Sequence, residues 1–129
     1  MFTVTIPSAM NETFARAFNS RDINNLMLLY EDNAVLQTDA GAQRIDGLDA
    51  IRAELTNLLQ APGKMRSVNN FCLEHGDLAL LRADWSLTGD DGQLVAWGSS
   101  AEVVRRQQDG TWRYLIDHAV GASVPKIAD

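Results

Sequence analysis

The segment from Gln93 to Gly121, QLVAWGSSAEVVRRQQDGTWRYLIDHAVG, constrains the fold more than any other part of the chain. Two long runs rich in Val, Trp, Tyr, Ile and Leu meet at Asp109-Gly110, a dipeptide typical of two-residue β-hairpin loops with positive φ at both positions. Such residues suit a pleated, half-buried surface. We therefore predict two antiparallel strands, 93–107 and 111–119.

The first half of the chain has the apolar spacing of helices. Ser8 is a good N-cap for a helix over 8–20, and Asp22 for a second helix that ends at Tyr30. A third helix starts at Asp49 and stops at Ala61-Pro62-Gly63. Two short strands, 34–38 and 42–45, are expected between the second and third helices.

From Lys64 the apolar period changes from 3.6 to 2, which predicts strands over 64–74 and 78–88. Helices followed by antiparallel strands indicate an α+β fold, a cone-shaped, curved antiparallel or mixed sheet wrapped round three N-terminal helices. A sheet bent in this way encloses a pocket. We expect one domain over 1–129, with a core of about 8–121, a short N-terminal arm and a polar C-terminal tail containing Pro125.

Composition excludes several classes of partner. With 46% hydrophobic and 22% charged residues the chain is globular, and a net charge of −6 argues against nucleic acid or an anionic membrane. The single cysteine, Cys72, cannot form an intrachain disulfide, and the start MFTVTIPSAMNE lacks the regions of a signal peptide. We expect a cytoplasmic protein. The two histidines show no metal-ligand spacing and no phosphate-binding loop occurs, so no metal or other cofactor is expected.

The order of elements resembles the nuclear-transport-factor-2-like superfamily, which includes SnoaL-like cyclases and ketosteroid isomerase. The resemblance rests on FNSRDINNLMLLYEDNAVLQTDAG followed by IDGLDAIRAEL, and on the hairpin EVVRRQQDGTWRYLIDHAVG. It covers about Ser8 to Gly121. It implies the cone-shaped (cystatin-like) fold, whereas this fold hosts isomerases, dehydratases, cyclases, hydrolases and members without a known reaction.

The resemblance to ketosteroid isomerase can be followed residue by residue. The position of its catalytic base matches Thr38, with Asp39 one residue later, and a one-residue slip in a strand turns the side chain to the other face. Its helix-one tyrosine matches Phe14, which has no hydroxyl. Its protonated oxyanion-binding acid matches Glu102. Because one of three groups is retained, genuine ketosteroid isomerase activity is not expected.

Two carboxylates on the last strands are the candidate catalytic residues. Glu102 lies among apolar residues, and burial would raise its pKa; alternatively it pairs with Arg82 or Arg105. Asp117 alternates with apolar neighbours on the face that lines the pocket in the family. It could act as a base or orient Tyr30, or it could make a structural hydrogen bond.

The candidate ligand-binding residues each have a structural alternative. His118 could titrate near neutral pH, but alternation puts it on the opposite face with Trp112 and Tyr114, so a pocket role requires a bulge. Tyr30 could point its hydroxyl into the pocket or serve the core. The remaining candidates are Trp85 on the more apolar face of its strand, Phe14, and Asp39, whose alternative is an ordinary solvated loop charge.

Two functions stay open. One is an enzyme that performs cofactor-free proton transfer on a small apolar or polyketide-like molecule, as an isomerase, cyclase or dehydratase does. The other is a non-catalytic ligand-binding or assembly module. Trp97, opposite in parity to Glu102, would lie on the outer sheet face with Val95 and Val103, and burial of these apolar groups predicts a homodimer through that face.

Overall fold

The computed structural model describes residues 2–123, so the predicted tail beyond Ser123, Pro125 included, lies outside the described residues. The helices are a 3₁₀ turn at Pro7–Ala9 followed by α1 (Met10–Asn19), α2 (Ile23–Met27) and α3 (Leu48–Leu58). The strands are β1 (Tyr30–Gln37), β2 (Ile45–Asp46), β3 (Lys64–His75), β4 (Leu78–Thr88), β5 (Leu94–Ser99), β6 (Ala101–Arg106) and β7 (Trp112–His118).

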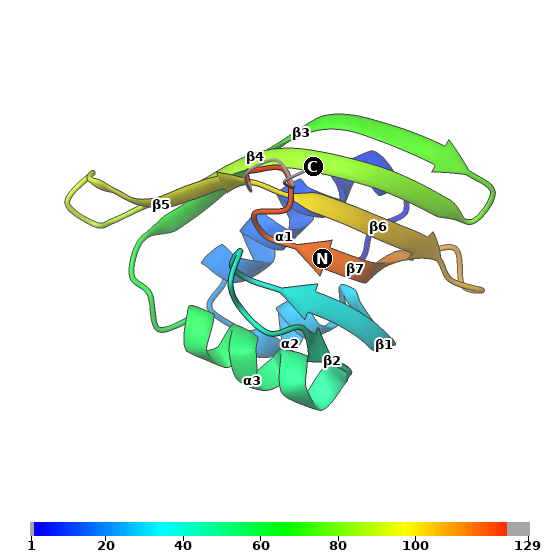
Figure 1. Ribbon diagram of the computed structural model, residues 1–129, viewed down its shortest axis with the longest axis horizontal. Coiled ribbons are helices and arrows are strands. Elements are labelled where there is room, and N and C mark those ends of the chain that lie inside the picture. The colour runs from blue at the N-terminus through cyan, green and yellow to red at the C-terminus, as the bar shows by residue number, and fades with distance from the viewer. Residues whose placement is uncertain (1, 124–129) are drawn as a thin grey trace.

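The strands form one mixed sheet in the order β2-β1-β7-β6-β4-β3. The first part of β4 pairs with β6 and the second part pairs with β5. All neighbours are antiparallel except β1 and β7, which run parallel. The sheet curves over α1, and α2 and α3 lie beside β1 and β2 (Figure 1). The expected α+β fold is confirmed, and the side chains buried between the curved sheet and the helices form its core.

The core explains why these segments fold as they do. On β4 the expected alternation is present: Ala79, Leu81, Ala83 and Leu87 are buried and Trp85 on the same face lines a cavity, whereas Leu80 and Asp84 on the other face are exposed. On α1, Met10, Ala17 and Phe18 are completely buried against the sheet. None of the helices in residues 2–123 is long and apolar enough to cross a membrane.

Several predicted boundaries need correction. The first helix begins at Met10, after the 3₁₀ turn, and its N-cap is Ala9 rather than Ser8. The second helix ends at Met27, and Tyr30 is the first residue of β1. The apolar run that includes Tyr30 fits a helix or a buried strand equally well. Pairing with β7 makes it a strand, because Tyr114 N–H donates to the Leu29 carbonyl at 2.7 Å.

The predicted strand 93–107 is divided into β5 and β6 at Ser100. Asp84 pairs with Ser99 and Leu81 pairs with Glu102, so the register against β4 is the same on both sides of the interruption. Because of this continuity Trp97 and Glu102 face opposite sides of the sheet, as their predicted parity requires.

The turn at the centre of the predicted hairpin is of a different type from that expected. Gly110 has φ 86°, whereas Asp109 does not have positive φ. Gly110 N–H donates to the Gln107 carbonyl, and Gln107 N–H donates to the Thr111 carbonyl. This is a three-residue loop, a type I turn followed by a left-handed glycine, and only the glycine needs the unusual backbone.

Candidate functional site

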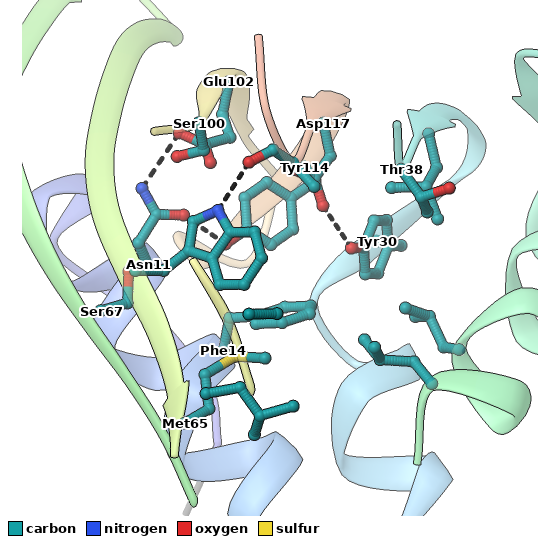
Figure 2. A pocket seen from close by; sticks show the side chains of 17 residues that line it. Asn11, Phe14, Tyr30, Thr38, Met65, Ser67, Ser100, Glu102, Tyr114 and Asp117 are labelled. Atoms are coloured by element: carbon teal, nitrogen blue, oxygen red, sulfur yellow. Dashed lines mark hydrogen bonds between the residues drawn. The ribbon is translucent and has the colours of Figure 1, made fainter. Parts of the chain in front are cut away.

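A cavity of about 160 Å³ lies between the concave face of the sheet and helices α1 and α3 (Figure 2). Its wall is largely apolar, and among the described residues none that lines it is basic. The apolar lining is Phe14, Tyr30, Leu36, Leu55, Leu58, Met65, Trp85, Leu87, Ala96, Tyr114 and Ala119. The polar lining is Asn11, Thr38, Ser67, Ser100, Glu102 and Asp117.

The two carboxyl groups of the cavity stand side by side. Glu102 on β6 and Asp117 on β7 are directly paired across the two strands, with both side chains in the cavity wall and only 4% and 8% of their surfaces exposed. Cross-strand partners have Cβ atoms about 4.5–5.5 Å apart. The pairing of the last strands therefore places two acids next to each other in an apolar environment.

Each acid has a different hydrogen-bond partner. Glu102 Oε1 accepts from the Asn11 amide at 3.0 Å, and Asp117 Oδ2 accepts from the Tyr30 hydroxyl at 2.5 Å. No fully buried side-chain oxygen among the described residues lacks a partner. Among the hydrogen bonds of the described residues only that of Tyr30 reaches the Asp117 side chain, so the other oxygen, Oδ1, has no donor there and is not completely buried.

The electrostatic environment separates the two acids. Burial raises the pKa of Glu102 to about 8, helped by the nearby charge of Asp117 and opposed by the neighbouring Ser100 hydroxyl and the Asn11 hydrogen bond. Burial raises the pKa of Asp117 to about 6, and the Tyr30 hydrogen bond opposes that rise. At neutral pH the cavity therefore holds one neutral acid and one carboxylate.

Two buried tyrosines complete the polar side of the cavity. The ring centroids of Tyr30 and Tyr114 are 5.0 Å apart, and the Tyr114 hydroxyl donates to Asn11 Oδ1 at 2.6 Å. Burial, together with the charge of Asp117, raises both tyrosine pKa values well above the usual range. Both hydroxyls therefore remain protonated and act as donors.

A bulge in β7 brings Tyr114 and Asp117 to the same face although they are three residues apart. Val103 pairs with Ile116 and the next residue, Val104, pairs with Tyr114, so Leu115 is the extra residue. Simple alternation placed Tyr114 on the outer face, and this prediction was wrong.

The family of the chain follows from a comparison with family models, in which the SnoaL-like domain matches residues 11–115. The chain belongs to the SnoaL-like family. The matched segment includes both carboxyl-bearing strands except the end of β7, and it confirms the resemblance inferred from the sequence. No protein of curated function matches the chain.

Solved structures show the same fold for this SnoaL-like chain. A domain of unknown function with a cystatin-like fold from Nostoc punctiforme is 13% identical with a TM-score of 0.76, covering 88% of this chain and 74% of that one. A ketosteroid isomerase-like protein from Erwinia carotovora atroseptica is 21% identical with a TM-score of 0.67, covering 86% and 92%. A structure from Thiobacillus denitrificans, provisionally named a calcium/calmodulin-dependent protein kinase type II association domain, is 24% identical with a TM-score of 0.74, covering 88% and 93%.

The structure brings together five of the seven residues singled out from the sequence of this SnoaL-like protein. These five line the cavity: Glu102, Asp117, Tyr30, Trp85 and Phe14. Asp39 lies outside it, exposed in the turn after β1, where its carboxylate accepts from the Ala40 N–H. His118 also lies outside, and its Nδ1 accepts from the Val120 N–H. Thr38, at the position of the ketosteroid isomerase base, contributes a hydroxyl to the wall.

The alternatives considered for Glu102 do not hold. Arg105 makes a two-pronged ion pair with Glu31, and Arg82 contacts Asn70 and Asp84. No three His, Cys, Asp or Glu side chains within residues 2–123 converge as a metal site would require.

Sequence reasoning missed Asn11, the buried amide that joins the two strands to α1. A signal was present, because Asn11 lies three, four and seven residues before Phe14, Ala15 and Phe18, on the apolar face of the helix. A polar residue on such a face needs a partner inside the protein.

Proposed function

We propose that the cavity binds a small, neutral, largely apolar carbonyl compound and moves a proton on the carbon next to the carbonyl group. Asp117 would act as the base and Glu102 as the hydrogen-bond donor to the carbonyl oxygen. The observation that supports this most directly is the paired acids, one neutral and one ionised near pH 7, in a single apolar cavity. Environments that separate the pKa values of two acids are typical of acid–base catalysis.

The chemistry balances without a further reagent. The Asp117 carboxylate takes the proton from the substrate carbon, and the electron pair moves onto the carbonyl oxygen, where the Glu102 proton stabilises the developing negative charge. Return of the proton from Asp117 to a different carbon of the conjugated intermediate gives an isomer. The carboxylate oxygen of Asp117 that Tyr30 leaves free is the one available for the proton.

The size and charge of the cavity narrow the substrate class. A volume of about 160 Å³ is close to the roughly 150 Å³ of an apolar cavity that admits benzene. We therefore propose a substrate of about one ring rather than a steroid. The ionised Asp117 and the lack of a basic lining residue within the described chain disfavour anionic substrates.

The test uses 3-cyclohexen-1-one, a one-ring ketone that becomes conjugated when a proton is moved, so that its absorbance reports the reaction. The protein should accelerate this isomerisation and also the exchange of the protons beside the carbonyl in D₂O. Asp117→Asn should abolish both, and Glu102→Gln should reduce them. Normal turnover by Asp117→Asn would show that the assignment of the base is wrong.

A second proposal, a binding module without catalysis, is favoured by the hydrogen bonds that already occupy both tyrosine hydroxyls. A one-ring ketone would then perturb the NMR signals of the cavity residues without any proton exchange. Mass spectrometry of a ligand that copurifies with the protein would identify the physiological occupant in either case.

For the outer face of the sheet we propose a homodimer. An apolar row crosses four strands in register, from Leu73 to Leu80, Val103 and Ile116. Leu73, Leu80 and Ile116 are 66%, 45% and 46% exposed, and Trp97 on the same face is 68% exposed. The name of the Thiobacillus denitrificans structure, an association domain, is consistent with assembly.

Analytical ultracentrifugation tests the dimer. Leu80→Lys should give a monomer, whereas Leu28→Lys should not, because Leu28 is a similarly exposed leucine on the helical side of the molecule. A wild-type monomer at tens of micromolar would contradict the proposal.

A further inference from the structure

The buried amide of Asn11 is held in one orientation by a chain of hydrogen bonds that starts at a backbone carbonyl. The Phe71 carbonyl can only accept, so the side-chain group of Asn69 that faces it at 3.2 Å must be the NH₂. The other end of that amide, Asn69 Oδ1, must then be an acceptor. It faces Asn11 at 2.9 Å, and the Asn11 group that meets it must be a donor.

This orientation determines what Asn11 offers to the cavity. Asn11 Nδ2 faces both Asn69 and Glu102, so the remaining N–H donates to Glu102 Oε1 at 3.0 Å. Asn11 Oδ1 faces Tyr114 and accepts its hydroxyl proton at 2.6 Å (Figure 2). Turning the amide over would place the Asn11 NH₂ against the Tyr114 hydroxyl, donor against donor unless the tyrosine reversed its own hydrogen bond, and would place oxygen against oxygen at Asn69.

We propose that Asn11 is a positioning residue that fixes the proton of Glu102 on Oε2, by holding Oε1 as a hydrogen-bond acceptor through the chain from the Phe71 carbonyl. An oxygen that accepts the Asn11 N–H acts as the carbonyl oxygen of the neutral acid. The hydroxyl must therefore be on the other oxygen, which is the one left to donate to a ligand. This inference rests on the proposed donor role of Glu102.

The surroundings of Glu102 contain no other group that would impose the same polarity. The titratable groups that face it are Asp117 and Tyr114 on β7 and Tyr30 on β1, and no basic side chain of the described residues reaches it. The Tyr30 and Tyr114 hydroxyls are committed to Asp117 and Asn11. The Ser100 hydroxyl, held between the N–H and carbonyl of Ala83, is the remaining polar neighbour.

Infrared spectroscopy of the resting protein reads the proposal directly. The carbonyl band of the neutral Glu102 side chain, identified by its loss in Glu102→Gln, should have the lowered frequency of a hydrogen-bonded carbonyl at pH 6. Asn11→Leu should move it to higher frequency, because Oε1 loses its donor. Asn70→Ala is the matched control, since Asn70 is the exposed neighbour of Asn69, its side chain hydrogen-bonds to Arg82 and Asp84 instead, and its loss should leave the band in place.

Loss of the Asn11 donor should also raise the pKa of Glu102 by roughly one unit, because a hydrogen bond to the ionised form is lost. This can be followed by carbon-13 NMR of the Glu102 carboxyl. If Asn11→Leu does not fold, Asn69→Ala serves instead: it removes the link to Phe71, and we expect a second, higher-frequency band from molecules with the amide reversed.

The result that would overturn the proposal is a single, unshifted Glu102 band in Asn11→Leu or Asn69→Ala. These readouts need no substrate, so they separate this inference from the proposed function. A shifted band with no isomerisation of any ketone would leave the positioning by Asn11 intact and contradict the enzyme. An unshifted band together with isomerisation that depends on Glu102 but not on Asn11 would support the enzyme and contradict the positioning by Asn11.

Discussion

Glu102→Gln tests whether burial really keeps this acid neutral, because glutamine has nearly the same shape as the neutral acid and cannot ionise. In the folded protein the pKa of Glu102 is raised to about 8, from an ordinary value of 4.5. A pKa that is higher in the folded state favours folding at low pH, where both states are protonated. As pH rises through 4.5 the unfolded chain ionises first, and stability falls until the folded pKa is passed.

The magnitude can be worked out for a window in which Asp117 contributes little. The pKa of Asp117 in the folded protein is about 6, so above that pH its contribution to the fall in the free energy of unfolding is largely complete. Between pH 6.5 and 8 the unfolded state is ionised at Glu102 and the folded state is mostly not. The free energy of unfolding should then fall by about 1.4 kcal/mol per pH unit, or roughly 2 kcal/mol over the window.

Urea unfolding followed by circular dichroism at pH 6.5, 7, 7.5 and 8 measures this slope in both proteins. We expect the wild-type protein to lose roughly 2 kcal/mol more than Glu102→Gln, because the two histidines are common to both and cancel in the difference. Glu74→Gln, an exposed strand glutamate, should behave as the wild type. Parallel wild-type and Glu102→Gln profiles would refute a neutral buried acid.

Three further substitutions test other parts of the site. Tyr30→Phe removes the donor to Asp117, so the pKa of Asp117 should rise above about 6. The acidic limb of the pH profile of proton exchange should then move to higher pH. An unmoved limb would contradict the pairing of Tyr30 with Asp117. Gly98→Ala places a Cβ 3.1 Å from the Trp85 ring and 3.0 Å from Val120, so the Trp85 ring should shift. The affinity for one-ring ligands should then fall several-fold, as measured by fluorescence titration. Gly63→Ala should lower the free energy of unfolding by about 2 kcal/mol or more, since φ is 111° and a Cβ would meet the Thr88 carbonyl; a loss below about 0.5 kcal/mol would show that the loop relaxes freely.

The sequence predicted the order of elements from local patterns, and it predicted the inward direction of Glu102 from the resemblance to ketosteroid isomerase. The alternation of β4 and the apolar spacing of the helices are repeated many times, so single errors do not change the fold. The prediction for Glu102 holds in the structure because the register against β4 continues unbroken past Ser100.

The contacts that assemble the site could not be predicted, because they depend on departures from those patterns. The extra residue at Leu115 turns Tyr114 inward, and no residue in WRYLIDH marks the bulge. The apolar neighbours of Tyr30 fit either period, so the sequence predicts a helix where the structure has a strand, although Tyr30 is among the partners that the sequence suggests for Asp117. Asn11 meets Glu102, 91 residues away, only after the sheet has closed over α1.

The bulge also explains how two acids can be kept apart chemically while they are adjacent in space. Without Leu115 as an extra residue, Asp117 and Tyr114 would face opposite sides, and the Asn11 amide would lose the donor that holds its oxygen. With the bulge, one strand supplies both Asp117, the proposed base, and Tyr114, whose hydroxyl anchors the Asn11 amide beside Glu102. The carboxylate of Asp117 is stabilised by Tyr30, whereas Glu102 has only a neutral amide, the Ser100 hydroxyl and a neighbouring negative charge, so the proton is held preferentially by Glu102. In the proposed reaction, the direction of proton transfer is thus set by the hydrogen-bond partners of the two acids rather than by the acids themselves.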